Sequence, residues 1–492
     1  MITFLVAIAV LIIGYLIYGV IVEKIFGANP KRPTPAITKA DGVDFVPMSG
    51  KKIFLVQFLN IAGLGPIFGA ISGALWGPVA FLWIVFGCIF GGAVHDYISG
   101  MISLRSDGAS LPEIVGKYQG KGMKNFMRFF AVILLVIVGA VFIKGPAVIL
   151  HDLTGLNTVI LAVIIFLYYL IATLAPVDKI IGKVYPIFGL VLLIMALGLF
   201  FALIFGKMHI PEISLSSFTN WHSSPEKFPT FPMLFVTIAC GAISGFHATQ
   251  SPMMARCMTN ERQGRKIFYG AMITEGVLAL IWAAVSMSFF GGVHELGTAM
   301  AKEGNNAAWV VNEICNTTLG KVGGALAIIG VVAAPITSGD TAFRSARLSI
   351  ADALGFSQKP ISKRLAISIP LFAAGLILTQ VDFGIIWRYF GWANQTLAAI
   401  TLWTLVLYMA KKSKPYIIVL IPAIFMTVVI TSYILVAPEG FGLKHSLGYL
   451  ISIIVSLIIT LIYLSIIKRR SVVVSLNKAK IEPKPEKVKA DN

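Results

Sequence analysis

The sequence contains little charge. Only 13% of its 492 residues are Asp, Glu, Lys or Arg, whereas soluble domains usually carry about 25%. That is too little to cover the surface of a soluble particle of this size. The four cysteines fall within or beside apolar segments, so a disulfide framework is excluded.

Motifs for nucleotide and metal chemistry are also absent. No Gly-rich loop followed by lysine is present, which excludes an ATP-driven pump within this chain. The Cys and His spacings match no zinc pattern, and Gly63-x-Gly65 lacks the third glycine of a dinucleotide-binding fingerprint. We therefore expect no cofactor, no bound metal and no enzymatic reaction.

Long apolar segments dominate what is present: 57% of the residues are hydrophobic, and the mean hydropathy is +0.86. A segment of about 20 apolar residues crosses the lipid bilayer as a helix, because all its backbone groups are then bonded internally. The sequence predicts an all-α integral membrane protein with about 13 transmembrane helices. They lie near residues 2–22, 53–76, 77–102, 126–149, 156–175, 184–207, 230–255, 265–290, 321–345, 364–380, 384–410, 416–437 and 446–468.

The basic residues fall mainly on one side of this predicted topology. Of the 40 Lys and Arg residues, 33 lie in one alternate set of loops and ends, and five lie in the other. Positively charged loops stay in the cytoplasm, so we expect the N-terminus outside and the C-terminus inside, ending in a basic cytoplasmic tail at 471–492. This distribution also explains the net charge of +18 without nucleic acid as a partner.

Glycine and proline interrupt two of the predicted helices. Broken backbone at membrane depth lines a cavity or is buried in protein, although such residues also serve as packing surfaces and kinks. Exposed half-helix ends suit a small anionic or zwitterionic solute. The substrate-binding candidates are Asn60, Gly63, Gly65 and Pro66 in the second helix, and Gly241, Ser244, Gly245, His247, Thr249 and Gln250 in the seventh.

The two interrupted helices are five apart, so each opens one of two consecutive sets of five helices with opposite orientation. This arrangement resembles the LeuT fold, with its 5+5 inverted repeat. We expect an N-terminal extra helix and loop at 1–52 and a core at 53–410 with repeats 53–207 and 230–410. Two appended helices at 411–470 would follow.

Ionisable residues inside membrane helices usually have a function and a partner. Asp340 and Arg344 are four residues apart and can pair, which would replace a bound cation or close an inner gate. The resemblance to LeuT-like transporters implies a cation site formed by the nearby hydroxyls of Thr337, Ser338 and Thr341.

A second group of ionisable residues suits proton handling. His95 and Asp96 are neighbours whose side chains point about 100° apart, and Glu275 lies near the middle of another helix. The alternative for the first pair is hydrogen bonds that lock two helices together. His247 is either a substrate contact or a packing histidine.

Three motifs resemble the carbon starvation protein A (CstA) family: residues 60–67 (NIAGLGPI), 91–97 (GGAVHDY) and 108–113 (GASLPE). The resemblance implies a transporter of the amino acid–polyamine–organocation superfamily in the bacterial cytoplasmic membrane, coupled to protons, with peptides or pyruvate as substrates. We therefore expect proton-coupled uptake of short peptides. The alternatives are a symporter of pyruvate or another small carboxylate, sodium as the coupling ion, a channel, and a nutrient-sensing receptor built on a transporter fold.

Overall fold

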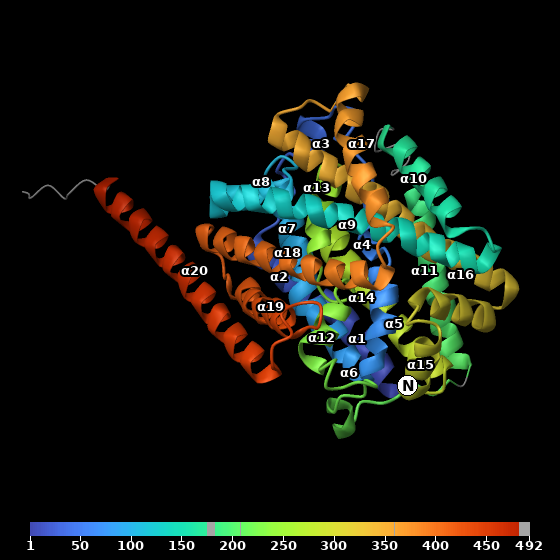
Figure 1. The fold of residues 1–492 in the computed structure, drawn as a ribbon. Helices are drawn as coiled ribbons and strands as arrows, with labels where there is room; N and C mark the ends of the chain where they lie inside the picture. The colour runs from blue at the N-terminus through green and yellow to red at the C-terminus, as the bar shows by residue number, and fades with distance from the viewer. Residues whose placement is uncertain (175–182, 207, 359, 482–492) are drawn as a thin grey trace, which may run out of the picture.

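The computed structural model describes residues 1–174, 183–206, 208–358 and 360–481, and these ranges form a helical bundle (Figure 1). The first half contains α1 (Ile2–Ile13), α2 (Gly19–Phe26), α3 (Pro35–Thr38), α4 (Gly50–Ala62), α5 (Ala70–Gly73), α6 (Val79–Phe86), α7 (Ala93–Leu104), α8 (Leu111–Gln119), α9 (Lys121–Thr154), α10 (Thr158–Leu174) and α11 (Tyr185–Phe205). Short π-helical segments at Gly14–Tyr18 and Gly87–Gly92 join α1 to α2 and α6 to α7.

The second half contains α12 (Thr230–Thr237), α13 (Gly245–Ala255), α14 (Gly270–Phe289), α15 (Val293–Lys302), α16 (Ala307–Leu354), α17 (Ile361–Leu378), α18 (Phe383–Lys411), α19 (Ile417–Val436) and α20 (His445–Ile481). Helix α20 lies at the edge of the bundle, where Figure 1 shows it against α19. Apolar side chains on its exposed surface, such as Leu461 at 58% exposure, suit contact with lipid.

Ten helices in the described residues are long and apolar enough to cross a membrane, or eleven if a bent pair counts as one span. Two further predicted spans coincide with a shorter apolar helix, Thr158–Ala172, and with the interrupted pair α12 and α13. The prediction of an all-α, multi-pass membrane protein is confirmed.

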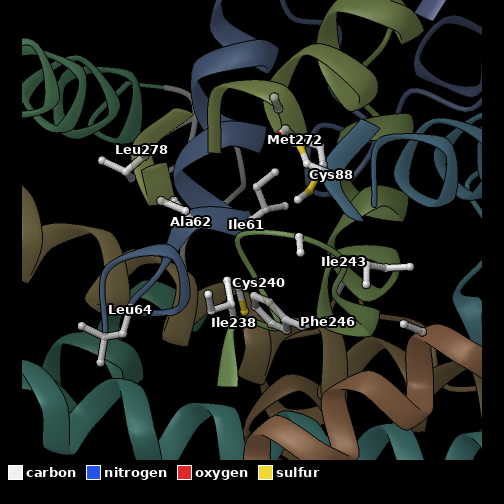
Figure 2. Close-up of a cluster of buried hydrophobic side chains, with 14 of the residues drawn as sticks. Ile61, Ala62, Leu64, Cys88, Ile238, Cys240, Ile243, Phe246, Met272 and Leu278 are labelled. Carbon is white, nitrogen blue, oxygen red and sulfur yellow. Dashed lines mark hydrogen bonds between the residues drawn. The ribbon is translucent and has the colours of Figure 1, made fainter. Parts of the chain in front are cut away.

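Both predicted helix breaks are present. The first bends the chain by 52° between Gly50–Ala62 and Gly65–Trp76, and Gly63 there has a φ of +45°, which few other residues adopt. The second lies at 238–244, between α12 and α13. The breaks touch, because a Cβ atom placed on Gly65 would lie 2.2 Å from the Cβ of Cys240. Figure 2 shows Ile238, Cys240 and Phe246 near Ile61, Ala62 and Leu64.

Two segments differ from the sequence-based expectation. The segment between the predicted spans at 265–290 and 321–345 is mostly helical, since it contains α15 and the first turns of α16. Helix α20 extends to Ile481, so the predicted cytoplasmic tail begins as a continuation of that helix. The predicted loop at 176–183, apart from Lys183, and the tail at 482–492 lie outside the described residues.

Candidate functional site

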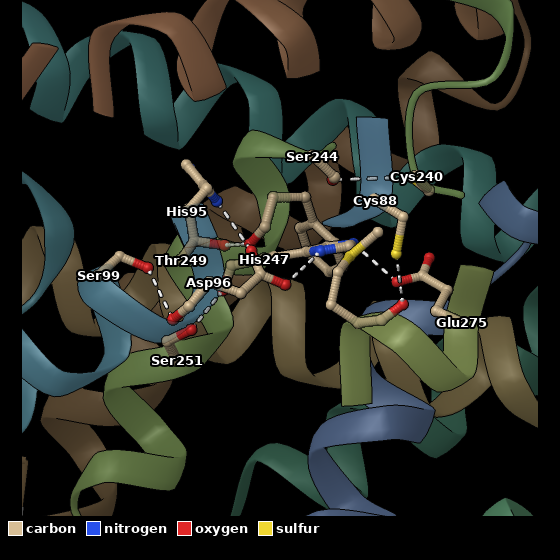
Figure 3. Close-up of polar contacts among 12 residues, drawn as sticks. Cys88, His95, Asp96, Ser99, Cys240, Ser244, His247, Thr249, Ser251 and Glu275 are labelled. Carbon is tan, nitrogen blue, oxygen red and sulfur yellow. Dashed lines mark hydrogen bonds and ion pairs between the residues drawn. The ribbon is translucent and has the colours of Figure 1, made fainter. Parts of the chain in front are cut away.

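A chain of four fully buried ionisable side chains lies beside the second break (Figure 3). Each carboxylate oxygen of Asp96 meets an imidazole: Oδ1 lies 2.8 Å from Nδ1 of His95, and Oδ2 lies 2.9 Å from Nδ1 of His247. The other ring nitrogen of His247 lies 3.5 Å from a carboxylate oxygen of Glu275. The chain thus joins α7, α13 and α14.

This contact between His95 and Asp96 was not required by the helix geometry, which separates neighbouring side chains by about 100°. The backbone carbonyl of His247 also accepts a hydrogen bond from Ser251, one turn later, at 3.0 Å. The structure therefore brings together residues that the sequence assigned to separate roles.

Glu275, the last member of this four-residue chain, has a buried carboxyl group. Neither of its carboxylate oxygens makes a hydrogen bond within the described residues. Its carboxylate lies 3.5 Å from His247 and within 4.8 Å of the Cys240 sulfur, and its charge acts on the buried Cys88 thiol. A buried carboxyl group without hydrogen bonds is costly as an anion, so this position suits a group that gains and loses a proton.

Three of these residues can also be considered as metal ligands. Donor atoms of Cys240, His247 and Glu275 lie within 4.8 Å of one another, and Asp96 orients the imidazole from the other side. However, the Cys240 sulfur is 3.7 Å from the Ser244 hydroxyl and 3.6 Å from the Asn394 amide, contacts typical of a neutral thiol. Within the four-residue chain, the two contacts of Asp96 with the imidazoles are hydrogen bonds, and Glu275 approaches His247 at 3.5 Å.

The first break places an amide side chain in a fully buried position. Neither the nitrogen nor the oxygen of the Asn60 side chain has a hydrogen bond in the described residues, and the same holds for Gln57 one turn earlier. Gly63 packs against a ring, since an added Cβ would lie 2.6 Å from Phe142. Buried polar groups normally find partners, so among the described residues the hydrogen-bonding capacity of these two amides is unused.

The second break is held by a residue that was not predicted from the sequence. The side-chain oxygen of Asn394, on α18, accepts hydrogen bonds from the Ser244 hydroxyl at 3.0 Å and from the Phe246 amide at 2.7 Å. It thereby caps α13 from another helix. Its signal in the sequence was a polar amide in the middle of a predicted membrane span.

Gly245, Thr249 and Gln250, which the sequence predicts to bind substrate, make close contacts in and around α13, and the side-chain oxygen of Gln250 has no hydrogen bond within the described residues. A Cβ on Gly245 would lie 2.4 Å from the backbone nitrogen of Ala398, so this glycine allows α13 to approach α18 closely. The Thr249 hydroxyl donates to the Phe246 carbonyl at 2.6 Å and accepts from the Gln250 amide at 2.9 Å. A Cβ on Gly241 would lie 2.6 Å from Ala279 and 4.0 Å from Pro66.

The predicted cation site on α16 contacts the first broken helix. The Ser338 hydroxyl donates to the Leu59 carbonyl at 3.0 Å, next to Asn60, whereas Thr337 and Thr341 bond to carbonyls of their own helix. Asp340 accepts a hydrogen bond from Tyr185 on α11 at 2.6 Å.

Two contacts of Arg344, which the sequence predicts to pair with Asp340, reach other parts of the chain. It donates to the Ala172 carbonyl at 2.9 Å and lies 4.0 Å from Asp44 in the loop before α4. The guanidinium therefore links α16 to the predicted cytoplasmic end of the bundle, and Tyr185 is the partner of Asp340 that the sequence did not indicate.

A cavity of about 260 Å³ leads from the opposite end to the two breaks. Its lining reaches Gly65 and Cys240 at one end and Arg388 and Glu439 at the other. A second cavity of about 460 Å³ adjoins it, and both include Arg388 in their linings.

The family profile described as carbon starvation protein CstA matches residues 1–149, 143–319 and 321–433 of the chain. The chain belongs to this family. The resemblance of its three sequence motifs is thus confirmed.

Several relatives resemble this CstA-family chain. It is 46% identical over 350 residues to an uncharacterized membrane protein of Haemophilus influenzae, covering 61% of this chain and 94% of that protein. It is 28% identical to the peptide transporter CstA of Bacillus subtilis, with coverage of 86% and 88%. It is 27% identical to the pyruvate/proton symporter BtsT of Escherichia coli, with coverage of 56% and 47%.

The fold of this CstA-family chain resembles that of a solved transporter. The crystal structure of the Eremococcus coleocola manganese transporter matches it with a TM-score of 0.51 at 13% identity, covering 88% of this chain and 98% of that one. Identity at this level shows the fold alone.

At the end of the bundle away from the cavity, ion pairs hold the loops of the CstA-family chain together. Glu261 accepts hydrogen bonds from the Arg105 guanidinium at 2.9 and 2.8 Å and from the Asn29 amide at 2.7 Å, and Arg32 lies 3.4 Å away. Burial alone would raise the pKa of Glu261, but these bonds and the positive charges hold it below its usual value. The carboxylate is therefore ionised at neutral pH.

Proposed function

We propose that this protein imports short peptides across the bacterial cytoplasmic membrane by proton-coupled alternating access. The observation that carries the proposal is the contact between the two helix breaks, beside a buried chain of two carboxyl groups and two imidazoles. Membership of the CstA family and the name of the Bacillus subtilis relative support peptides as the substrate class.

The proposal includes a LeuT-like core of two inverted five-helix repeats, at 53–207 and 230–410, within thirteen spans. The matching positions of the breaks, each at the start of its set of five helices, support this arrangement. The overall similarity to a solved transporter is consistent with it. Helix α1 with α2 would then be the additional N-terminal span, and α19 and α20 the appended pair.

The substrate site in this proposal lies between the breaks. The cavity reaches Gly65 and Cys240, while the buried amides of Gln57 and Asn60 supply hydrogen bonds on the first broken helix. The opposite end is closed by the Glu261 cluster and by Arg344 near Asp44. This combination describes a transporter open toward one side only, as alternating access requires.

Proton coupling is assigned to the four-residue chain and to Asp340. Asp96 faces His95 on its own helix, His247 on α13, and Glu275 and the Cys88 and Cys240 thiols beyond. Two carboxyl groups buried together repel when both are ionised, so the chain favours an added proton. Because His247 follows the second break, a change in its proton sharing can alter how α13 is held.

The orientation proposed is N-terminus outside and C-terminus inside. Within the described residues, each ion pair between loops joins two members of the same predicted set, such as Arg265 with Glu23, or the N-terminal amine with Glu212. Loops that pair must lie on the same side of the membrane. This segregation therefore supports the division of the loops into two sides, from which the distribution of 33 and 5 basic residues predicts the orientation.

Uptake into proteoliposomes tests the function. Labelled di- and tripeptides, pyruvate and single amino acids would be offered under an imposed proton or sodium gradient. We expect tripeptide accumulation that follows the proton gradient and stops when a protonophore collapses it. Uptake of pyruvate alone would favour the second candidate, a pyruvate–proton symporter, which the name of the Escherichia coli relative supports. Accumulation of neither would overturn the transport proposal.

A further inference from the structure

The outer cavities contain a cation whose hydrogen-bonding capacity is unused. Arg388 projects from the second turn of α18, and its side chain is 46% exposed. It lies near one end of the predicted span at 384–410, where a long cationic side chain can extend to the membrane surface. The structure instead places it in the lining of both cavities, together with Trp387 and Gly384.

One edge of this guanidinium is already oriented. Its Nε atom lies 3.7 Å from a carboxylate oxygen of Glu439, and Glu439 itself accepts a hydrogen bond from the Tyr433 hydroxyl. Among the described residues, this contact of Nε with Glu439 is the polar interaction found for Arg388. The two terminal nitrogens therefore remain as a planar pair of donors, the geometry that matches both oxygens of a carboxylate.

We propose that Arg388 binds the carboxylate group of the entering substrate, and that Glu439 is a positioning residue that orients the guanidinium. The carboxylate would be the C-terminus of a peptide or the single acid group of a small carboxylate. This inference rests on the proposed transport function, which it makes more specific by naming the group recognised.

The path from this site to the helix breaks is continuous. One cavity is lined by Arg388 and Glu439 and also by Gly65 and Cys240. A substrate held by its carboxylate at Arg388 thus lies in the same space as the proposed central site. Trp387 and Phe390, on the same face of the cavity, supply apolar contacts for a side chain.

The test compares a peptide with and without its carboxylate. Purified protein in proteoliposomes would be given trialanine, trialanine amide and pyruvate. In Arg388→Gln we expect the KM for trialanine to rise about ten- to a hundredfold, the effect of losing a hydrogen-bonded charge, while the KM for the amide stays unchanged. Arg388→Lys should recover part of the loss. Lys302→Gln is the matched control, since Lys302 is exposed nearby but lines neither cavity.

The variant Glu439→Gln tests whether Glu439 orients the Arg388 guanidinium or has only a structural role. It should raise the KM for trialanine but add nothing in the Arg388→Gln background, because it acts through the guanidinium. A merely structural role would impair uptake of trialanine and its amide alike. A rise in the KM for pyruvate in Arg388→Gln would show that Arg388 also binds the carboxylate of a small acid.

Thermal protection of the detergent-purified protein supplies a readout that does not need transport. Protection by trialanine or pyruvate that is lost in Arg388→Gln would support the site even if proteoliposomes showed no uptake, in which case the transport proposal alone fails. Peptide uptake with an unchanged KM in Arg388→Gln would overturn the carboxylate site alone. Absence of both protection and uptake would overturn both.

Discussion

His247 and Asp96 are joined across two helices, with Nδ1 of the imidazole 2.9 Å from a carboxylate oxygen. His247 lies in the first turn of α13, directly after the second break, and Asp96 lies in α7. The same carboxylate also holds His95, and the far side of the His247 ring faces Glu275. The break is thus linked to a group of side chains whose charge depends on bound protons.

Replacing Asp96 with asparagine tests this link. The amide can still hydrogen-bond to an imidazole but cannot carry a proton or balance an imidazolium charge. We expect Asp96→Asn to lose accumulation driven by a proton gradient, down to the level seen without a gradient, while exchange of substrate between equal pools continues. Both activities are measured in proteoliposomes.

Asp107→Asn is the matched control, because Asp107 is exposed and, within the described residues, forms a surface ion pair with Lys39. Equal loss of exchange and of gradient-driven accumulation in Asp96→Asn would mean that Asp96 locks the helices together and does not couple protons.

The contact between the two breaks predicts a compensating pair of substitutions. In Gly65→Ala the new Cβ would lie 2.2 Å from the Cβ of Cys240, so we expect destabilisation of about 1–3 kcal/mol and loss of uptake. Cys240→Gly in the same chain removes the clash and should restore thermal stability and part of the uptake. Gly122→Ala, where an added Cβ meets nothing within 4 Å, is the control. Failure of the second substitution to restore stability would show that the clash is not the cause.

Much of this site could be predicted from sequence because membrane burial makes certain residues conspicuous. Gly63 and Pro66 interrupt an apolar run, and His95, Asp96 and Glu275 stand out because ionisable groups are rare in spans. Their assembly could not be predicted, since it depends on how α7, α13 and α14 cross.

The residues that were missed share a physical reason. Tyr185 and Asn394 are polar but uncharged, so their burial carries a weaker signal than that of a carboxylate. Arg388 lies near a span end, where extension to the membrane surface accounts for a cation equally well. Only the fold reveals that it faces a cavity beside Glu439.

The Glu261 cluster predicts a pH-dependent contribution to stability. Because its pKa is lower in the folded protein than in the unfolded chain, Glu261 stabilises the fold above the unfolded value, and this contribution is lost as the pH falls through the folded value. We expect Glu261→Gln to cost about 3 kcal/mol at pH 7, because Arg105 is left partly buried with the Gly27 carbonyl but without a carboxylate to balance its charge.

Thermal unfolding of the detergent-purified protein between pH 7 and pH 3 measures this difference. It should shrink as the pH falls and the wild-type carboxylate takes up a proton. Glu113→Gln is a comparison from the same end of the bundle, where Lys124 and Arg128 pair with a more exposed carboxylate and the loss should be smaller. A difference that does not change with pH would indicate a packing effect.

Asp340 provides the final test of the coupling ion. It lies on α16 two residues after Ser338, whose hydroxyl reaches the Leu59 carbonyl, at the place where LeuT-like transporters are expected to hold a cation. Arg344, one turn later, adds a positive charge nearby, and two unit charges 4 Å apart repel by about 4 kcal/mol at an effective dielectric constant of 20. This repulsion disfavours sodium, whereas a proton on the carboxyl group needs no cage of ligands.

Asp340→Asn should therefore abolish acceleration by an inward proton gradient and leave exchange intact. Tyr185→Phe, which removes the hydrogen bond to Asp340 but keeps its carboxyl group, should retain that acceleration. If Asp340 only closes a gate, Asp340→Asn will impair exchange as well, and uptake that follows a sodium gradient at fixed pH while ignoring a pH difference would refute proton coupling.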